Sequence, residues 1–152
     1  MSNGVITKNG CLYFKPNTKT MQKNNMVDIT GTTSTISSSY TGYGKITLGS
    51  GDTAPTIDDY EMDSVLNNLT LITEVTKGYG KETGESAEYG DPIATNTATY
   101  RNDTNANIEV KEIGLIFNDT WYNRWFLIYR EVLDTPVVIE PNHTKSFSVT
   151  IS

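Results

Sequence analysis

The chain has 152 residues and a formal net charge of −6, with 36% hydrophobic, 10% aromatic and 20% charged residues. This length fits one domain that can bury its own core. The acidic balance argues against DNA and anionic membranes as partners, because both are bound through Lys and Arg. The single cysteine excludes an intrachain disulfide and a thiolate metal cluster within one chain.

Residues 1–44 are polar and are interrupted by Gly and Asn, with short apolar clusters at residues 11–14 and 26–29. We interpret them as a long N-terminal arm, ordered by its own core or by neighbouring subunits, that precedes a domain of residues 45–152. Residues 1–5 lack the start of a secretion signal, and no apolar run has the length of a membrane span. We therefore expect a protein that is neither exported by a cleaved signal nor embedded in a membrane.

The domain is expected to begin with a short strand at residues 45–48, which ends at Gly49 and Gly51 before the turn signal at Pro55. Met62 and Leu66 then recur at helical spacing behind several acidic residues. This pattern predicts one short helical turn within residues 58–66.

Alternating apolar residues predict a strand over residues 69–77 and another over residues 94–101. The polar residues 102–105 predict a hairpin turn to a partner strand at residues 108–117. Within that strand the apolar parity changes between Val110 and Ile113. A one-residue slip moves every side chain to the other face, so we expect a β-bulge or a crossing between sheets near Lys111 and Glu112.

Residues 125–133 form a nearly continuous apolar run, and a turn is expected at residues 134–136. Residues 137–139 and 147–151 are expected to form a final hairpin around residues 141–143. Seven or so short strands at this spacing predict an all-β protein, an antiparallel β-sandwich of the immunoglobulin-like or jelly-roll-like type.

Motifs for catalysis and cofactor binding are incomplete. A phosphate loop around Gly44 and Lys45 fails because Ser39 and Ile46 stand where the motif needs Gly and Ser or Thr. The lone Cys11 and the lone His143 lie far apart in the chain. Five clustered acidic residues offer Ca²⁺ ligands, although a solvated acidic loop is the favoured interpretation: Asp52, Asp58, Asp59, Glu61 and Asp63. We expect no catalytic residue, no cofactor and no metal.

Aromatic residues gather with arginines near residue 125, a composition that favours interfaces and also stacks on sugars. The alternatives are a core strand, a subunit interface or, third, a carbohydrate platform built from Trp121, Tyr122 and Trp125. The predicted interface residues are Trp121, Tyr122, Trp125, Tyr129, Arg130 and Glu131. Arg130 and Glu131 are candidates for structural ion pairs, either within the core or between subunits.

Several segments between residues 45 and 152 resemble minor virion proteins of tailed bacteriophages. They are residues 46–52 (ITLGSGD) with Ala54 and Pro55, then Asp59, residues 112–115 (EIGL), residues 127–132 (LIYREV) with Pro136 and Val137, and residues 147–151 (FSVTI). The resemblance does not extend to the polar N-terminal region, which is a candidate for attachment specificity.

The resemblance implies a non-enzymatic structural protein of a virion, such as a head fibre, a decoration protein, a collar protein or a tail-associated protein. It also implies a homo-oligomer that contacts other virion proteins and is assembled in the cytoplasm of the bacterial host. The alternative function is a carbohydrate-binding adhesion module of a phage fibre.

Overall fold

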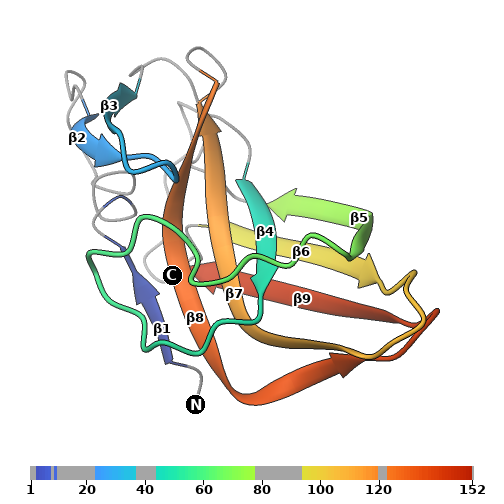
Figure 1. Ribbon diagram of the computed structural model, residues 1–152. Coiled ribbons are helices and arrows are strands. Elements are labelled where there is room, and N and C mark those ends of the chain that lie inside the picture. Colours follow the sequence, from blue (N-terminus) through green and yellow to red (C-terminus); the bar gives the residue numbers. More distant parts are fainter. Residues whose placement is uncertain are drawn as a thin grey trace.

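Nine β-strands account for most of the described residues in the computed structural model (Figure 1). The structure describes residues 3–7, 9, 23–36, 44–77, 94–119 and 123–151. The strands are β1 (Asn3–Ile6), β2 (Lys23–Val27), β3 (Thr33–Ile36), β4 (Gly44–Gly49), β5 (Thr70–Lys77), β6 (Ala94–Arg101), β7 (Ile108–Asp119), β8 (Arg124–Ile139) and β9 (Thr144–Ile151).

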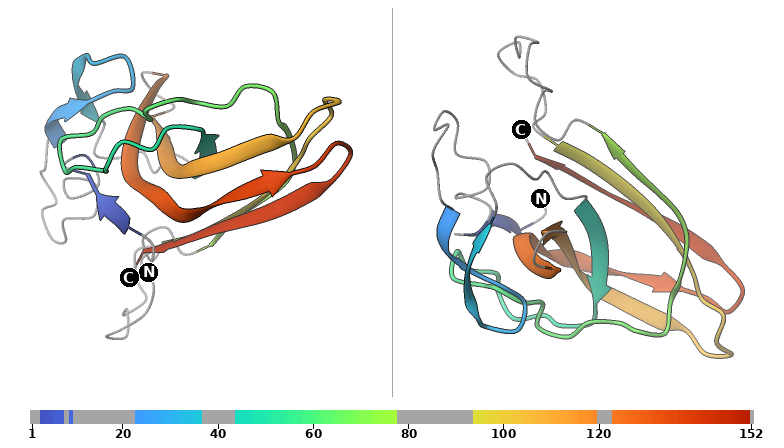
Figure 2. Two further views of the ribbon diagram at one scale, coloured as in Figure 1. Left: turned by 60° about the horizontal axis from the view of Figure 1, so that its bottom comes forward. Right: turned by 90° about the horizontal axis from the view of Figure 1, so that it is seen from above.

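Two antiparallel sheets face each other and form a sandwich (Figure 2). One sheet has four strands in the order β1-β8-β7-β4, and the other has three in the order β5-β6-β9. A separate ribbon pairs β2 with β3 beside the four-stranded sheet. The predicted all-β, sandwich-like fold is confirmed.

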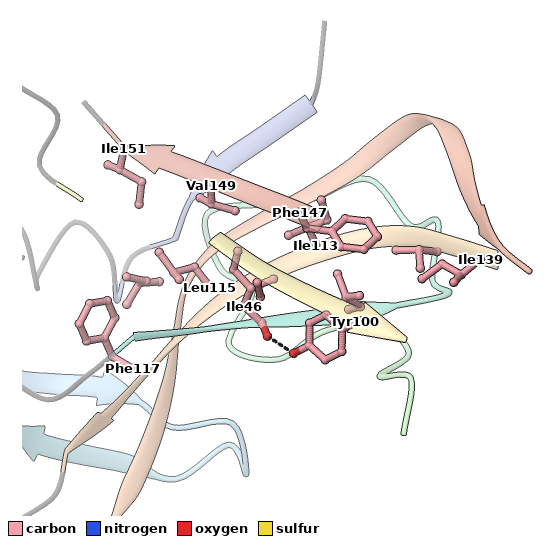
Figure 3. Close-up of a cluster of buried hydrophobic side chains, with 13 residues drawn as sticks. Ile46, Tyr100, Ile113, Leu115, Phe117, Ile139, Phe147, Val149 and Ile151 are labelled. Carbon is pink, nitrogen blue, oxygen red and sulfur yellow. Dashed lines mark hydrogen bonds between the residues drawn. The ribbon is translucent and has the colours of Figure 1, made fainter. Parts of the chain in front are cut away.

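The core lies between the two sheets because apolar side chains alternate along their strands (Figure 3). Each fully buried large apolar side chain stabilises the fold by about 1.5–3 kcal/mol. Tyr100 of β6 donates a hydrogen bond of 2.5 Å to the Ile46 carbonyl of β4, so it joins the two layers. The buried core residues are Ile46, Leu48, Ala98, Tyr100, Val110, Ile113, Leu115, Phe117, Ile128, Ile139, Phe147, Val149 and Ile151.

The expected irregularity near Lys111 and Glu112 is confirmed by the register of β7 and β8. Val110 pairs with Val137, whereas Glu112 pairs with Val132. β8 therefore carries several extra residues at this point, and both halves of β7 can turn apolar side chains toward the core. β8 is one strand from Arg124 to Ile139, so the turn predicted at residues 134–136 is wrong.

Two predicted hairpins are wrong because each connection leads from one sheet to the other. β6 pairs with β5 and β9, whereas β7 pairs with β4 and β8. In the same way, the end of β8 pairs with β7, and β9 pairs with β6. Residues 102–107 and 140–143 thus form two adjacent corners of the sandwich (Figure 1).

Asn102 holds these corners together, and we call its surroundings the Asn102 corner. Its side-chain amide donates to the carbonyls of Ala106 and Ile139, at 2.7 and 2.8 Å. Its side-chain oxygen accepts from the backbone and hydroxyl of Thr104. Its backbone exchanges hydrogen bonds with Asn142 and His143. A fully buried neutral side chain thereby satisfies backbone groups from both corners.

The helical turn predicted within residues 58–66 is absent, and the chain passes through turns and bends there. Residues 50–66 instead form a long loop across the outer face of the four-stranded sheet (Figure 1). Met62 is buried over Gly114 of β7, where an added Cβ would collide with the Met62 sulfur. Met62 is therefore apolar because it packs on the sheet, and its spacing from Leu66 does not reflect a helix.

The described parts of the N-terminal region contact the sandwich. β1 pairs with β8, with Gly4 opposite Glu131. Thr7 continues this attachment through hydrogen bonds to the carbonyls of Leu127 and Ile128, at 2.7 and 3.1 Å. The side chain of Asn9 bonds both backbone groups of Val27, so it ties the β2–β3 ribbon to the start of the chain.

Candidate functional site

Three charged side chains meet on the outer face of the four-stranded sheet, under the loop of residues 50–66. We call Asp59, Glu112 and Arg130 the ion cluster. The guanidinium of Arg130 donates to Glu112 through Nε and to Asp59 through Nη1, each at 2.8 Å. Its Nη2 donates to the Thr53 carbonyl at 3.0 Å. Arg130 is 2% exposed and Glu112 is 0% exposed, so the pair between them is shielded from water.

The carboxylate of Glu112 also anchors the backbone of the loop. It accepts hydrogen bonds from the backbone N–H groups of Gly51 at 3.3 Å, Asp63 at 3.3 Å and Ser64 at 2.7 Å. With Arg130, four donors converge on one carboxylate. A charged acceptor is suited to such a task because hydrogen bonds to ionised groups are about twice as strong as neutral ones.

Three glycines make room for the ion cluster and for the loop that covers it. A Cβ on Gly49 would collide with the side chain of Glu112 and would lie 2.6 Å from the Ser64 carbonyl. A Cβ on Gly51 would collide with the side chain of Asp63. A Cβ on Gly114 would collide with the Met62 sulfur, so none of the three positions has room for a side chain.

Hydrogen bonds hold both ends of the Asp59–Arg130 pair in the charged form. Burial raises the pKa of the Asp59 carboxyl, but hydrogen bonds from Thr56 and Arg130 outweigh it and hold the pKa below its usual value. Burial lowers the pKa of Arg130, and the hydrogen bonds to Asp59 and Glu112 outweigh that effect and raise it. The charged side chains of the ion cluster thus fix the loop of residues 50–66, and the Glu112 side chain is fully buried beneath it.

The acidic residues considered as Ca²⁺ ligands are spread along the same loop. Asp63 accepts hydrogen bonds from the backbone and hydroxyl of Thr53, while Asp59 belongs to the ion cluster. Asp52 lies 3.6 Å from the ammonium of Lys111. Among the residues that the structure describes, no group of three or more His, Cys, Asp or Glu side chains is arranged to hold a metal ion.

A hollow of about 390 Å³ opens beside the ion cluster on the same face, and we call it the outer pocket. Its walls come from β4, β7, β8, the loop and the turn that joins β2 to β3. The described lining residues are Ile29, Lys45, Thr47, Glu61, Met62, Val65, Ile116 and Trp125. Ile29 and Val65 at its rim are 36% and 48% exposed, so part of the apolar lining is open to solvent.

Two independent hydrogen-bond systems hold the walls of the outer pocket. On one side, Asp28 accepts from the backbones of Thr30 and Thr32, which shapes the turn, and the Ile29 N–H donates to the Trp125 carbonyl at 3.0 Å. On the other side, the ion cluster fixes the loop that contributes Glu61, Met62 and Val65. The pocket is thus formed before any ligand arrives.

The six predicted interface residues have different surroundings. Trp121 and Tyr122 lie outside the described residues, as does Cys11. Trp125 lines the outer pocket, and Arg130 is part of the ion cluster. Tyr129 is half-buried beneath Gly4 of β1, and its hydroxyl donates to the buried Glu131 at 2.9 Å.

Sequence reasoning missed the pairing of Arg130 with Glu112 and the outer pocket. A signal for the pairing exists, because Glu112 directly precedes the apolar run of residues 113–117, and a carboxylate inside a buried strand requires a partner. The pocket has no comparable signal, since its lining residues come from five separate segments of the chain.

Comparisons with protein-family models, with curated proteins and with solved structures found no match. No helix among the described residues has the length and apolar character needed to cross a membrane.

Proposed function

We propose that this chain is a non-enzymatic structural component of a tailed-phage virion, attached to the capsid, collar or tail through protein contacts. The observation that carries the proposal is the convergence of the resembling segments on one structural unit. Gly49, Asp59, Glu112 and Arg130 come from four separate segments and meet at the ion cluster. The segments that carry the resemblance therefore lie together in the fold, which supports the proposal.

The role of the ion cluster supports a scaffold function. Glu112 and Arg130 form hydrogen bonds with the loop and with each other. A loop fixed in this way presents a constant surface to a neighbouring subunit, and preorganised surfaces bind with a smaller loss of conformational entropy.

Strand edges offer a route to assembly. β5 and β9 are the outer strands of the three-stranded sheet, and edge strands pair readily with other chains. β5 also exposes Leu71, Ile72 and Val75 at 36%, 43% and 49%. A homo-oligomer or a contact with another virion protein would cover this apolar edge.

Labelling of purified particles tests the proposal. Antibodies raised against the recombinant chain are expected to bind gradient-purified particles of the phage that encodes it, and to mark one position on them in electron micrographs. Native mass spectrometry of the recombinant chain is expected to show a defined oligomer. Recovery of the protein only from the soluble lysate of infected cells, with none on intact particles, would overturn the proposal.

A further inference from the structure

We propose that the outer pocket binds a neutral pyranose sugar. Trp125 would be the apolar platform, and Lys45, Thr47 and Glu61 would form hydrogen bonds with the sugar hydroxyls. This inference goes beyond the proposed function, because a scaffold that assembles through protein contacts needs no saccharide site. It assigns a ligand class to a hollow built from five separate segments of the chain.

The size and the lining of the outer pocket fit a small molecule. Its volume of about 390 Å³ lies within the range of about 300–1,000 Å³ that is typical of small-molecule sites. Such sites have mostly apolar walls with a few placed polar groups. Here Ile29, Met62, Val65, Ile116 and Trp125 supply the apolar walls.

The polar lining residues select the charge of the ligand. Lys45 carries a positive charge and Glu61 a negative one, so the pair adds no net charge to the pocket. An anion would be opposed by Glu61 and a cation by Lys45. A neutral ligand is therefore favoured over either.

The same residues argue for a ligand rich in hydroxyl groups. An entirely apolar ligand would strip water from Lys45, Thr47 and Glu61 and return no hydrogen bond, which is costly. A sugar hydroxyl can accept from the Lys45 ammonium, donate to the Glu61 carboxylate and do either with Thr47. One face of a pyranose ring carries C–H groups, and the electron-rich face of an indole such as Trp125 attracts them.

The surrounding structure holds these groups in place without a ligand. The Ile29–Trp125 backbone hydrogen bond fixes one wall, and the contacts of Glu112 with Asp63 and Ser64 fix the segment that carries Glu61 and Val65. A preformed site loses little entropy on binding, which is needed where few hydrogen bonds hold the ligand.

The test is an NMR titration of the isolated, isotope-labelled chain with the methyl glycosides of glucose, galactose, mannose and N-acetylglucosamine. At least one glycoside is expected to shift the amide signals of Thr47 and Ile116 and the indole signal of Trp125 in a saturable manner. Glu61→Gln and Lys45→Met are each expected to weaken that binding about tenfold, the usual size of a lost hydrogen bond to a charged group.

Matched controls are Glu140→Gln and Lys145→Met, which alter exposed side chains of the same types away from the pocket. They are expected to leave the dissociation constant unchanged. Thermal unfolding of each variant shows whether it remains folded.

Two results would overturn the inference. One is the absence of saturable shifts with all four glycosides at roughly 50 mM, well above a millimolar dissociation constant. The other is binding of benzyl alcohol, and of none of the glycosides, at these residues, since the pocket would then accept an apolar side chain of a partner protein. Both readouts use the isolated chain, so they are independent of its presence on virus particles.

Discussion

The ion cluster and the Asn102 corner are two places where polar side chains enter the interior, and they differ in charge. Glu112 and Arg130 are a charged pair on the outer face of the four-stranded sheet. Asn102 is neutral and lies where the chain crosses between the sheets. The side chains of Glu112, Arg130 and Asn102 are all almost completely buried.

The difference follows from what each place must hold. The Asn102 corner joins short connections whose backbone groups lie close together, and one amide with two donors and one acceptor suffices. The ion cluster must hold the loop of residues 50–66, whose N–H groups point at one spot from Gly51, Asp63 and Ser64. Several converging donors favour an ionised acceptor, and burial of that acceptor requires a cation such as Arg130.

Glu112→Gln should have the largest effect, because it leaves the Arg130 charge buried with one partner fewer. Breaking a buried ion pair from one side costs about 3–5 kcal/mol. Urea unfolding would measure this loss of stability. The control Glu109→Gln, on the same strand with a side chain that is 52% exposed, should change stability by less than about 0.5 kcal/mol. Equal effects of the two changes would contradict the role given to Glu112.

Asn102→Ala should have a smaller effect, because only neutral hydrogen bonds are lost. The carbonyls of Ala106 and Ile139 lose their donor, and an unsatisfied buried group costs about 1–3 kcal/mol. The exposed Asn105, in the same connection, provides the control as Asn105→Ala. If Asn102→Ala lost as much free energy of unfolding as Glu112→Gln, the proposed difference between the ion cluster and the Asn102 corner would be wrong.

Acid should weaken the ion cluster and spare the Asn102 corner. The folded-state pKa of Asp59 lies below its unfolded value, so its contribution is present at neutral pH and is lost as the pH falls through the folded pKa. The wild type should therefore be more stable than Asp59→Asn at pH 7, and the difference should shrink below about pH 4. Urea midpoints at several pH values measure it. The deficit of Asn102→Ala should stay constant over the same range.

Glu74→Gln should produce the smallest change, and in the opposite direction. Glu74 on β5 has a buried side-chain oxygen without a hydrogen-bond partner, and burial raises its pKa despite the nearby Lys45. Stability associated with the protonated carboxyl is present below the unfolded pKa and is lost as the pH rises. The variant should melt at a slightly higher temperature at pH 7, with no gain below about pH 4. A lower melting temperature at pH 7 would contradict the view that burial of the Glu74 carboxylate destabilises the fold at neutral pH.

The fold class and the bulge could be predicted because both depend on residue parity along a strand. Apolar residues alternate with period two, and the change of parity between Val110 and Ile113 predicts an irregularity in the ladder, which the shifted register of β7 and β8 shows. Strand pairing could not be predicted in this way. The polar residues after Arg101 suit a hairpin turn as well as a connection between two sheets. Only the folded structure, in which the buried Asn102 bonds both corners, shows that the connection crosses between the sheets.

The ion cluster was predictable in part. Arg130 was expected to form an ion pair, but its partner depends on the register of β7 and β8, in which Gly114 lies opposite Arg130 and Glu112 opposite Val132. The outer pocket was not predictable except for Trp125, because residues as distant as Ile29 and Ile116 share it only after folding.

The pairing of β1 with β8 also constrains when the protein can finish folding. Gly4 lies opposite Glu131, so β1 pairs with a strand that is synthesised more than a hundred residues later. Closing so long a segment of chain is slow compared with forming the β7–β8 hairpin. During synthesis β1 therefore has no β8 to pair with until β8 has emerged from the ribosome. In that interval β1 can pair instead with the β8 edge of another newly made copy.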